Sequence, residues 1–160
     1  MSSDPGALSD PASRPRIVLA VGLPGSGKST YFRKLGVTPI SSDSIRLLLA
    51  DDETDQSIHG RVFATVRFLL QQRIELGRPA TYVDATNLTR RDRRMYLKIA
   101  RENNCRLEAL CFETPLSICK ARNAGRKRVV PDHVLDLMAA KYVPPSMEEG
   151  FDVVARVAVS

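Results

Sequence analysis

Two hydrophobic patterns alternate along the chain. Residues 16–21 are almost entirely apolar, which is typical of a strand covered on both faces of a sheet. Between residues 56 and 76 the apolar positions recur three or four residues apart, which predicts an amphipathic helix that ends at Gly77 and Pro79. The chain therefore combines a buried strand with at least one long helix.

Shorter segments repeat this alternation. Strands are also expected at residues 37–41, 80–84, 106–112 and 151–159, and helices at 28–35, 42–49, 89–103, 116–123 and 131–143. This order predicts a three-layer α/β/α fold with a central, mostly parallel sheet of about five strands. Ligands of such folds bind at the edge formed by the C-terminal ends of the strands.

The composition places this fold in one domain with a short tail. Residues 1–15 are rich in Ser, Pro, Asp and Gly and are expected to form a disordered N-terminal tail, with the folded domain at 16–160. No stretch approaches the ~18 consecutive apolar residues of a membrane span. The three cysteines have no C-x-x-C spacing, which indicates reduced thiols and a cytoplasmic protein.

The net charge of +6 is unevenly distributed. Residues 90–128 contain twelve basic and four acidic residues, and Thr89 with Asp92 has the spacing of a capping box that opens a basic helix. Such a cluster suits a polyanionic partner, either a nucleotide or a nucleic acid. A solvated helix face explains the arginines of residues 90–101 equally well.

A phosphate-binding loop follows the first strand. The segment fits G-x-x-x-x-G-K-[ST] and reads Gly22-Leu23-Pro24-Gly25-Ser26-Gly27-Lys28-Ser29-Thr30. Its backbone N–H groups are expected to cradle the phosphates of ATP, Lys28 to reach the β- and γ-phosphates, and Ser29 to bind Mg²⁺. Because a strand precedes the loop and a helix follows it, the motif predicts a P-loop NTPase-type fold.

Polar residues at two other strand ends are expected to meet this loop. Asp43 and Arg46 follow the second strand three residues apart, so one carboxylate and one guanidinium can face the same side and bind an acceptor hydroxyl and its phosphate. A simple helix cap is the alternative for Asp43. After the third strand, Thr86 and Asn87 are candidate substrate contacts, and Asp84 is either a magnesium ligand or a turn residue.

A basic loop near residues 124–130 has the composition of a lid. Arg122, Arg126 and Arg128 lie just before Pro131 and can close over the triphosphate to stabilise transition-state charge. A solvated basic loop is the alternative.

These motifs, in order, resemble a known family. The phosphate loop, Ser42-Asp43-x-x-Arg46, Asp84-Ala85-Thr86-Asn87-Leu88 and Arg122-Asn123-x-x-Arg126-x-Arg128 are similar to motifs of the 5′-hydroxyl polynucleotide kinase group of P-loop phosphotransferases. The resemblance implies that Asp43 is the general base toward a 5′-hydroxyl and that Arg46 contacts a neighbouring phosphate. It also implies that Arg122 and either Arg126 or Arg128 clamp ATP.

Three functions remain to be compared. The leading one is an ATP- and Mg²⁺-dependent kinase, with an Arg-bearing lid, that phosphorylates the 5′-hydroxyl of DNA or RNA. The alternatives are a kinase of a small hydroxyl compound, such as a nucleoside, sugar or antibiotic, and a non-catalytic ATP-binding switch. Intact Lys28, Ser29 and Asp43 argue against the switch.

Overall fold

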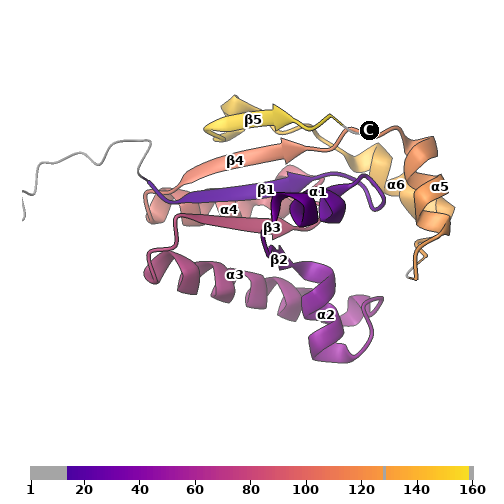
Figure 1. Ribbon diagram of the computed structural model, residues 1–160, viewed down its shortest axis with the longest axis horizontal. Helices are drawn as coiled ribbons and strands as arrows, with labels where there is room; N and C mark the ends of the chain where they lie inside the picture. The colour runs from indigo at the N-terminus through magenta and orange to yellow at the C-terminus, as the bar shows by residue number, and fades with distance from the viewer. Residues whose placement is uncertain (1–13, 128, 159–160) are drawn as a thin grey trace, which may run out of the picture.

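Five parallel strands form one sheet at the centre of the computed structural model, which describes residues 14–127 and 129–158. The strands lie in the order β2-β3-β1-β4-β5. Their bounds are β1 Arg16–Val21, β2 Ile40–Ser41, β3 Ala80–Asp84, β4 Arg106–Cys111 and β5 Val153–Arg156. Since every strand points the same way, all C-terminal ends meet at one edge (Figure 1). The predicted parallel sheet is confirmed.

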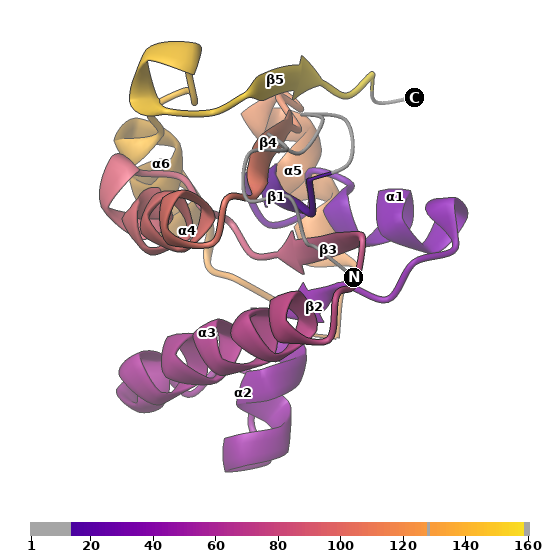
Figure 2. The same cartoon turned by 90° about the vertical axis from the view of Figure 1, so that its left-hand side faces the viewer.

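The helices cover both faces of the sheet. In Figure 2 α1 lies on one face, and α3 and α4 lie on the other; α5 and α6 stand at the C-terminal end of the strands in Figure 1. Their bounds are α1 Lys28–Leu35, α2 Ser42–Ala50, α3 His59–Glu75, α4 Arg90–Glu102, α5 Leu116–Ala124 and α6 Asp132–Lys141. The three-layer α/β/α fold predicted from the sequence is therefore confirmed.

Alternation along β1 divides the core in two. Ile17, Leu19 and Val21 belong to a large cluster with apolar residues of α3 and α4. Ala20 belongs to a smaller one with Phe32 of α1. Successive side chains of a strand point to opposite faces, so β1 packs against α3 and α4 on one face and against α1 on the other.

Several element boundaries differ from those expected. β2 contains only residues 40–41, because the backbone N–H of Val37 still bonds the end of α1 at Phe32. Residues 56–58 form a separate 3₁₀ turn before α3, and β5 is limited to residues 153–156. The capping box is confirmed: Thr89 accepts from the N–H of Asp92 at 3.1 Å, and its own N–H donates to that carboxylate at 3.3 Å.

One arginine of the basic helix α4 is part of the core. Arg93 has no exposed surface and donates two hydrogen bonds, at 2.7 and 2.8 Å, to the carboxylate of Glu149. It donates a third to the backbone carbonyl of Asn87 at 2.9 Å. The prediction that residues 90–101 form a uniform solvated or polyanion-binding face is thus wrong for Arg93, which joins α4 to the 3₁₀ turn at residues 147–149.

Within residues 14–127 and 129–158, the structure contains no helix long and apolar enough to cross a membrane.

Candidate functional site

The phosphate loop turns sharply between β1 and α1. Gly25 has φ +82°, and a Cβ atom on it would lie 2.8 Å from the carbonyl oxygen of Cys119, so only glycine fits there. Gly27, with φ 104°, occupies the N-cap of α1 without any side-chain cap. The first N–H groups of α1 therefore face an anion-binding position at the positive end of the helix.

Lys28 is held inside this loop. Its ammonium donates hydrogen bonds of 2.8 Å to the backbone carbonyls of Gly22 and Leu23. Burial lowers the pKa of Lys28 to about 8, with Asp84 and Asp43 acting in the opposite direction and Arg126 lowering it further. A phosphate group would supply the opposite charge that the buried ammonium lacks, so this side chain is prepared for an anionic ligand.

Ser29 and Asp84 form an oxygen-rich point between α1 and the end of β3. The Ser29 hydroxyl donates a 2.7 Å hydrogen bond to the Asp84 carboxylate. A hydroxyl and one carboxylate, with phosphate oxygens and water, are the ligands that Mg²⁺ takes at nucleotide sites. Among the described residues no group of three or more His, Cys, Asp and Glu could hold a metal ion.

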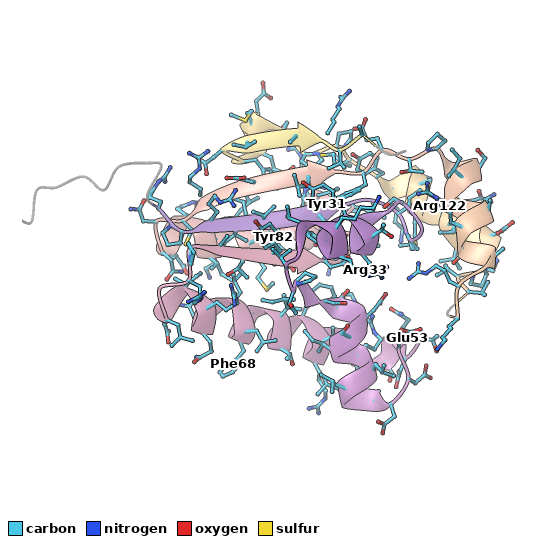
Figure 3. All side chains as sticks on the ribbon, in the orientation of Figure 1. Tyr31, Arg33, Glu53, Phe68, Tyr82 and Arg122 are labelled. Atoms are coloured by element: carbon cyan, nitrogen blue, oxygen red, sulfur yellow. The ribbon has the colours of Figure 1, made fainter. Side chains whose placement is uncertain are left out.

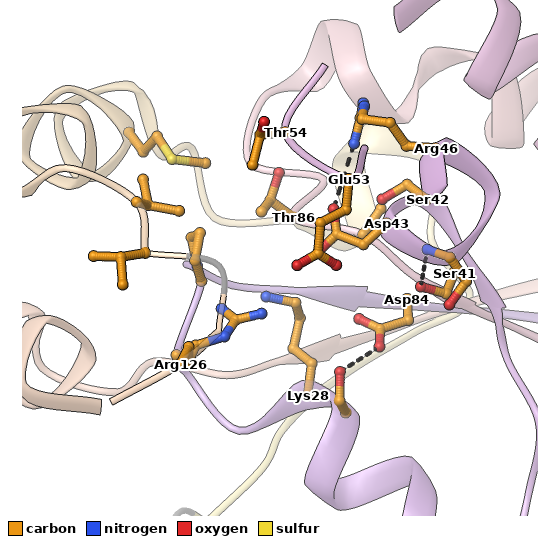
Figure 4. Close-up of a pocket in the computed structure, with 18 of the residues that line it drawn as sticks. Lys28, Ser41, Ser42, Asp43, Arg46, Glu53, Thr54, Asp84, Thr86 and Arg126 are labelled. Carbon is orange, nitrogen blue, oxygen red and sulfur yellow. Dashed lines mark hydrogen bonds and ion pairs between the residues drawn. The ribbon is translucent and has the colours of Figure 1, made fainter. Parts of the chain in front are cut away.

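Asp43 lies in the first turn of α2 without capping it. Ser41 is the N-cap, and its hydroxyl accepts from the N–H of Ser44 at 3.2 Å. Arg46, which is 4% exposed, donates to the Asp43 carboxylate at 3.3 Å. The cap proposed as the alternative role of Asp43 is therefore filled by Ser41, and Asp43 and Arg46 face the same crevice (Figure 4).

A cavity of about 940 Å³ joins these groups, which is at the large end of small-ligand sites. Figure 4 shows Lys28, Asp84, Asp43 and Arg126 around it. The predicted residues that line it are Pro24, Gly25, Gly27, Lys28, Ser29, Thr30, Asp43, Arg46, Asp84, Thr86, Arg122 and Arg126. Segments up to about 100 residues apart in sequence thus meet at the C-terminal edge of the sheet.

The lid loop is pinned at its base. The buried amide of Asn123 donates to the carbonyl of Val130 at 2.5 Å and accepts from its N–H at 3.0 Å, which ties the last turn of α5 to Val130. Arg122 donates to the carbonyl of Gly25 at 3.5 Å, and Arg126 points into the cavity. Arg128 lies outside the described residues.

Three predicted contacts lie under the site and do not line it. Asn87 is 2% exposed, and its amide donates to the carbonyl of Ala20 at 2.9 Å. The predicted substrate contact of Asn87 is therefore not supported, because its side chain ties the end of β3 to β1. Gly22 and Ser26 are also buried, and the Thr114 hydroxyl bonds the carbonyl of Ser26 at 2.8 Å. Gly22 and Ser26 therefore contribute to the conformation of the phosphate loop without lining the cavity.

Sequence reasoning missed other residues of the cavity. Glu53, from the acidic connection after α2, faces the crevice opposite Arg122 (Figure 3). His59 and Phe63 reach it from the first turns of α3, and Val134 and Met138 from α6. Glu53 lies in an acidic connection at residues 50–54, which is a signal that could have pointed to it, whereas the other four residues fit ordinary helix patterns.

Comparisons with known proteins place this geometry in a wider group. A family model described as an AAA domain matches residues 17–145. The L-seryl-tRNA(Sec) kinase of Methanococcus maripaludis is 22% identical over 143 residues, which cover 85% of this chain and 56% of that protein. The chain thus spans little more than half the length of this relative.

Solved structures share the fold. A chain of the Pnkp1/Rnl/Hen1 RNA repair complex matches with a TM-score of 0.66 and 21% identity, over 80% of this chain and 44% of that one. The APS kinase CysC of Mycobacterium tuberculosis, in complex with AMPPNP and APS, matches with a TM-score of 0.58 and 18% identity, over 92% and 91%. The sheet, the helices and the phosphate loop are those of the P-loop kinase fold.

Proposed function

The chain belongs to the AAA domain family, whose model matches residues 17–145, and on this premise we propose that it is an ATP- and Mg²⁺-dependent kinase of 5′-hydroxyl ends of nucleic acid. The observation on which the proposal rests is the meeting of Asp43 with Lys28 and Asp84 in one cavity. A carboxylate beside a phosphate loop gives the site a base as well as a nucleotide-binding group.

The donor side would bind ATP through the phosphate loop. The N-terminal N–H groups of α1 and the Lys28 ammonium would bind the β- and γ-phosphates, and Ser29 with Asp84 would hold Mg²⁺. When bound, Mg²⁺ would neutralise part of the phosphate charge. Lys28 leaves the carbonyls of Gly22 and Leu23 as it takes a phosphate partner.

The acceptor side is organised by Asp43 and Arg46. The oxygen of the acceptor hydroxyl forms a bond to the γ-phosphorus, and the Asp43 carboxylate accepts the proton of that hydroxyl. The bond from the γ-phosphorus to the β–γ bridging oxygen breaks, and ADP leaves. Arg46 holds the carboxylate at 3.3 Å and presents its guanidinium to the next phosphate of the acceptor. Arg122 and Arg126 stabilise the charge that develops on the transferring group.

The acceptor class is supported by two observations. The proteins matched include an L-seryl-tRNA(Sec) kinase and a chain of an RNA repair complex, so two of them are connected with RNA by name. Arg90, Arg91 and Arg94 are exposed on α4 and could bind phosphates along a strand. The Glu53 carboxylate in the cavity favours the second candidate, a small hydroxyl compound, because a carboxylate there repels an anionic strand.

The decisive experiment offers both acceptor classes at once. The protein is incubated with γ-labelled ATP and Mg²⁺ and with 5′-OH DNA and RNA oligonucleotides, or with a panel of nucleosides and sugars. Label at the 5′ end of oligonucleotides supports the proposal, and preferential labelling of a small compound assigns the site to the second candidate. ATP binding without transfer to any acceptor would instead indicate a nucleotide-dependent switch.

A further inference from the structure

An aromatic pair lines the acceptor side of the cavity. His59 and Phe63 lie one turn apart on α3, and their ring centroids are 4.7 Å apart at an interplanar angle of 40°. Phe63 is half-buried against the core, whereas His59 is exposed. Because both line the cavity, the pair presents a ring surface to it.

Two apolar side chains of α6 also line the cavity. Val134 and Met138 lie one turn apart on α6 and line the same cavity. Figures 1 and 2 show α6 on the β4–β5 side of the sheet, and α2 with the start of α3 on the β2 side. Together with the aromatic pair they offer apolar surface to the cavity, which is lined elsewhere by Val129, Val130 and Pro131 as well as by charged and polar groups.

His59, Phe63, Val134 and Met138 form what we call the slot, and they come from other elements than the phosphate loop. α3 packs against α2, which presents Asp43 to the cavity, whereas the lid arginines reach in from the side of α5. No lysine or arginine belongs to the four slot residues His59, Phe63, Val134 and Met138, and Glu53 lines the same cavity. A phosphate is therefore disfavoured there, and a flat apolar group with polar edges is favoured.

We propose that this slot binds the terminal nucleobase of the acceptor strand. The inference rests on the proposed function and adds to it, since the protein would recognise the base next to the reacting 5′-hydroxyl. The base stacks on Phe63 and His59 and is covered by Val134 and Met138, while its sugar points the hydroxyl at Asp43. Stacking of this kind tolerates all four bases, so the slot would require a base without selecting one.

The test compares two 5′-OH oligonucleotides of the same sequence, one with an abasic terminal residue. We expect kcat/KM for the abasic strand to be ~10- to 100-fold lower, the scale of losing one stacked base. Phe63→Leu keeps an apolar group against the core, and it should lower kcat/KM for the normal strand while leaving the abasic strand unchanged. His59→Ala, at an exposed position, should act in the same direction.

Matched controls lie on the same elements. Phe68→Leu changes a phenylalanine on the outer side of α3, 61% exposed (Figure 3), and His133→Ala changes an exposed histidine; both should leave the ratio of the two substrates unaltered. Equal kcat/KM for the two strands in the unaltered protein, or a Phe63→Leu effect on ATP affinity, would overturn the slot while the kinase proposal stands. No labelling of any oligonucleotide by a protein that binds ATP overturns the acceptor proposal itself.

Discussion

The hydroxyl of Ser29 donates a 2.7 Å hydrogen bond to the carboxylate of Asp84, which joins the first turn of α1 to the end of β3. These residues are 55 positions apart in sequence, and their contact depends on the adjacent, parallel pairing of β1 and β3. Both oxygens lie at the edge of the cavity. A hydroxyl beside a carboxylate is the arrangement on which the proposed magnesium site rests.

Asp84→Asn should make ATP binding nearly independent of Mg²⁺. The amide is isosteric but neutral, and a hard cation loses most of its attraction to the site without the carboxylate. Titration calorimetry would give Kd for ATP with Mg²⁺ and with a chelator, and we expect the ratio of the two to fall by about tenfold in the variant. Asp132→Asn changes an exposed aspartate at the start of α6, outside the cavity, and serves as the control. A ratio unchanged in Asp84→Asn would assign Asp84 to the turn.

ATP affinity should fall as the pH rises above 8. Burial lowers the pKa of Lys28 to about 8 in the free protein, and a bound phosphate raises it. Below pH 8 the Lys28 side chain is therefore charged in both the free and the bound protein. Above pH 8 the free protein holds a neutral amine, which must take up a proton when ATP binds. We expect Kd to rise by up to tenfold per pH unit above pH 8, and Lys28→Met to show weak binding without this dependence.

In the protein without ATP, the buried Lys28 lowers the free energy of unfolding below its value at high pH. Between pH 8 and 10.5 the unfolded chain holds a proton on Lys28 that the folded protein has released, so stability rises with pH over this window. The lowering of the pKa from 10.5 to about 8 is equivalent to ~3 kcal/mol, which the unaltered protein regains over this window. Lys28→Met removes the titrating group, so the free energy of unfolding of the variant should lack the rise between pH 7 and pH 10 that this lysine gives the unaltered protein. Urea denaturation at both pH values would measure this.

A buried and an exposed arginine of α4 should differ in their contribution to the stability of the protein. Arg93→Met leaves the Glu149 carboxylate buried and unpaired, and we expect it to lower the free energy of unfolding by ~3–5 kcal/mol. Arg94→Met, one position along and exposed, should cost little. Urea denaturation of both variants makes the comparison, and equal losses would contradict the buried pair.

If α4 also binds the acceptor strand, its exposed arginines determine the salt dependence. Changing Arg90, Arg91 and Arg94 together to Gln should lower the slope of log Kobs against log salt by up to ~3, because each lost phosphate contact contributes about 0.7–0.9. An unaltered slope would mean that these three arginines form a solvated face.

The lid should affect the chemical step more than ATP binding. Arg126 points at the cavity, and Asn123 fixes the base of the loop through its two bonds to Val130. We expect Arg126→Ala to lower the single-turnover rate by ~10²-fold or more with a small change in Kd for ATP. Lys127→Ala, an exposed neighbour in the same loop, is the control. Loss of ATP affinity with the rate retained would make Arg126 a docking group.

Most of the fold and half of the site could be predicted from local patterns. The apolar run of β1, the glycines of the loop and the capping box at Thr89 each act within a few residues, so their consequences can be read directly from the sequence. Parallel strands then place Asp43 and Asp84 at one edge of the sheet. Local rules were sufficient wherever one element determined the outcome.

The remaining features depend on contacts between distant segments. Arg93 reads as one more surface charge until Glu149, 56 positions away, is brought against it. Asn87 reads as a polar strand-end residue, although its amide is required by a carbonyl of β1. Phe63 follows the apolar spacing of α3, and nothing in that spacing distinguishes a core position from a cavity wall. Each depends on the packing of elements that helical periodicity alone does not specify.

Asp43→Asn separates the kinase from a nucleotide-dependent switch. Asp43 shares the cavity with Lys28, is 38% exposed at its side chain, and bonds Arg46 at 3.3 Å, while Ser41 caps the helix. The amide retains the shape and a hydrogen bond to Arg46 but cannot take the hydroxyl proton, so we expect phosphoryl transfer to fall by ~10²–10⁴-fold with ATP affinity nearly unchanged. Asp51→Asn, at the C-cap of the same helix and outside the cavity, is the matched control. Single-turnover transfer, ATP titration and thermal melting should be measured on both variants. Because the cap belongs to Ser41, the melting temperature of Asp43→Asn should stay within a few degrees of the unaltered protein; a large drop in melting temperature with transfer retained would show that Asp43 holds the helix and that another group accepts the proton.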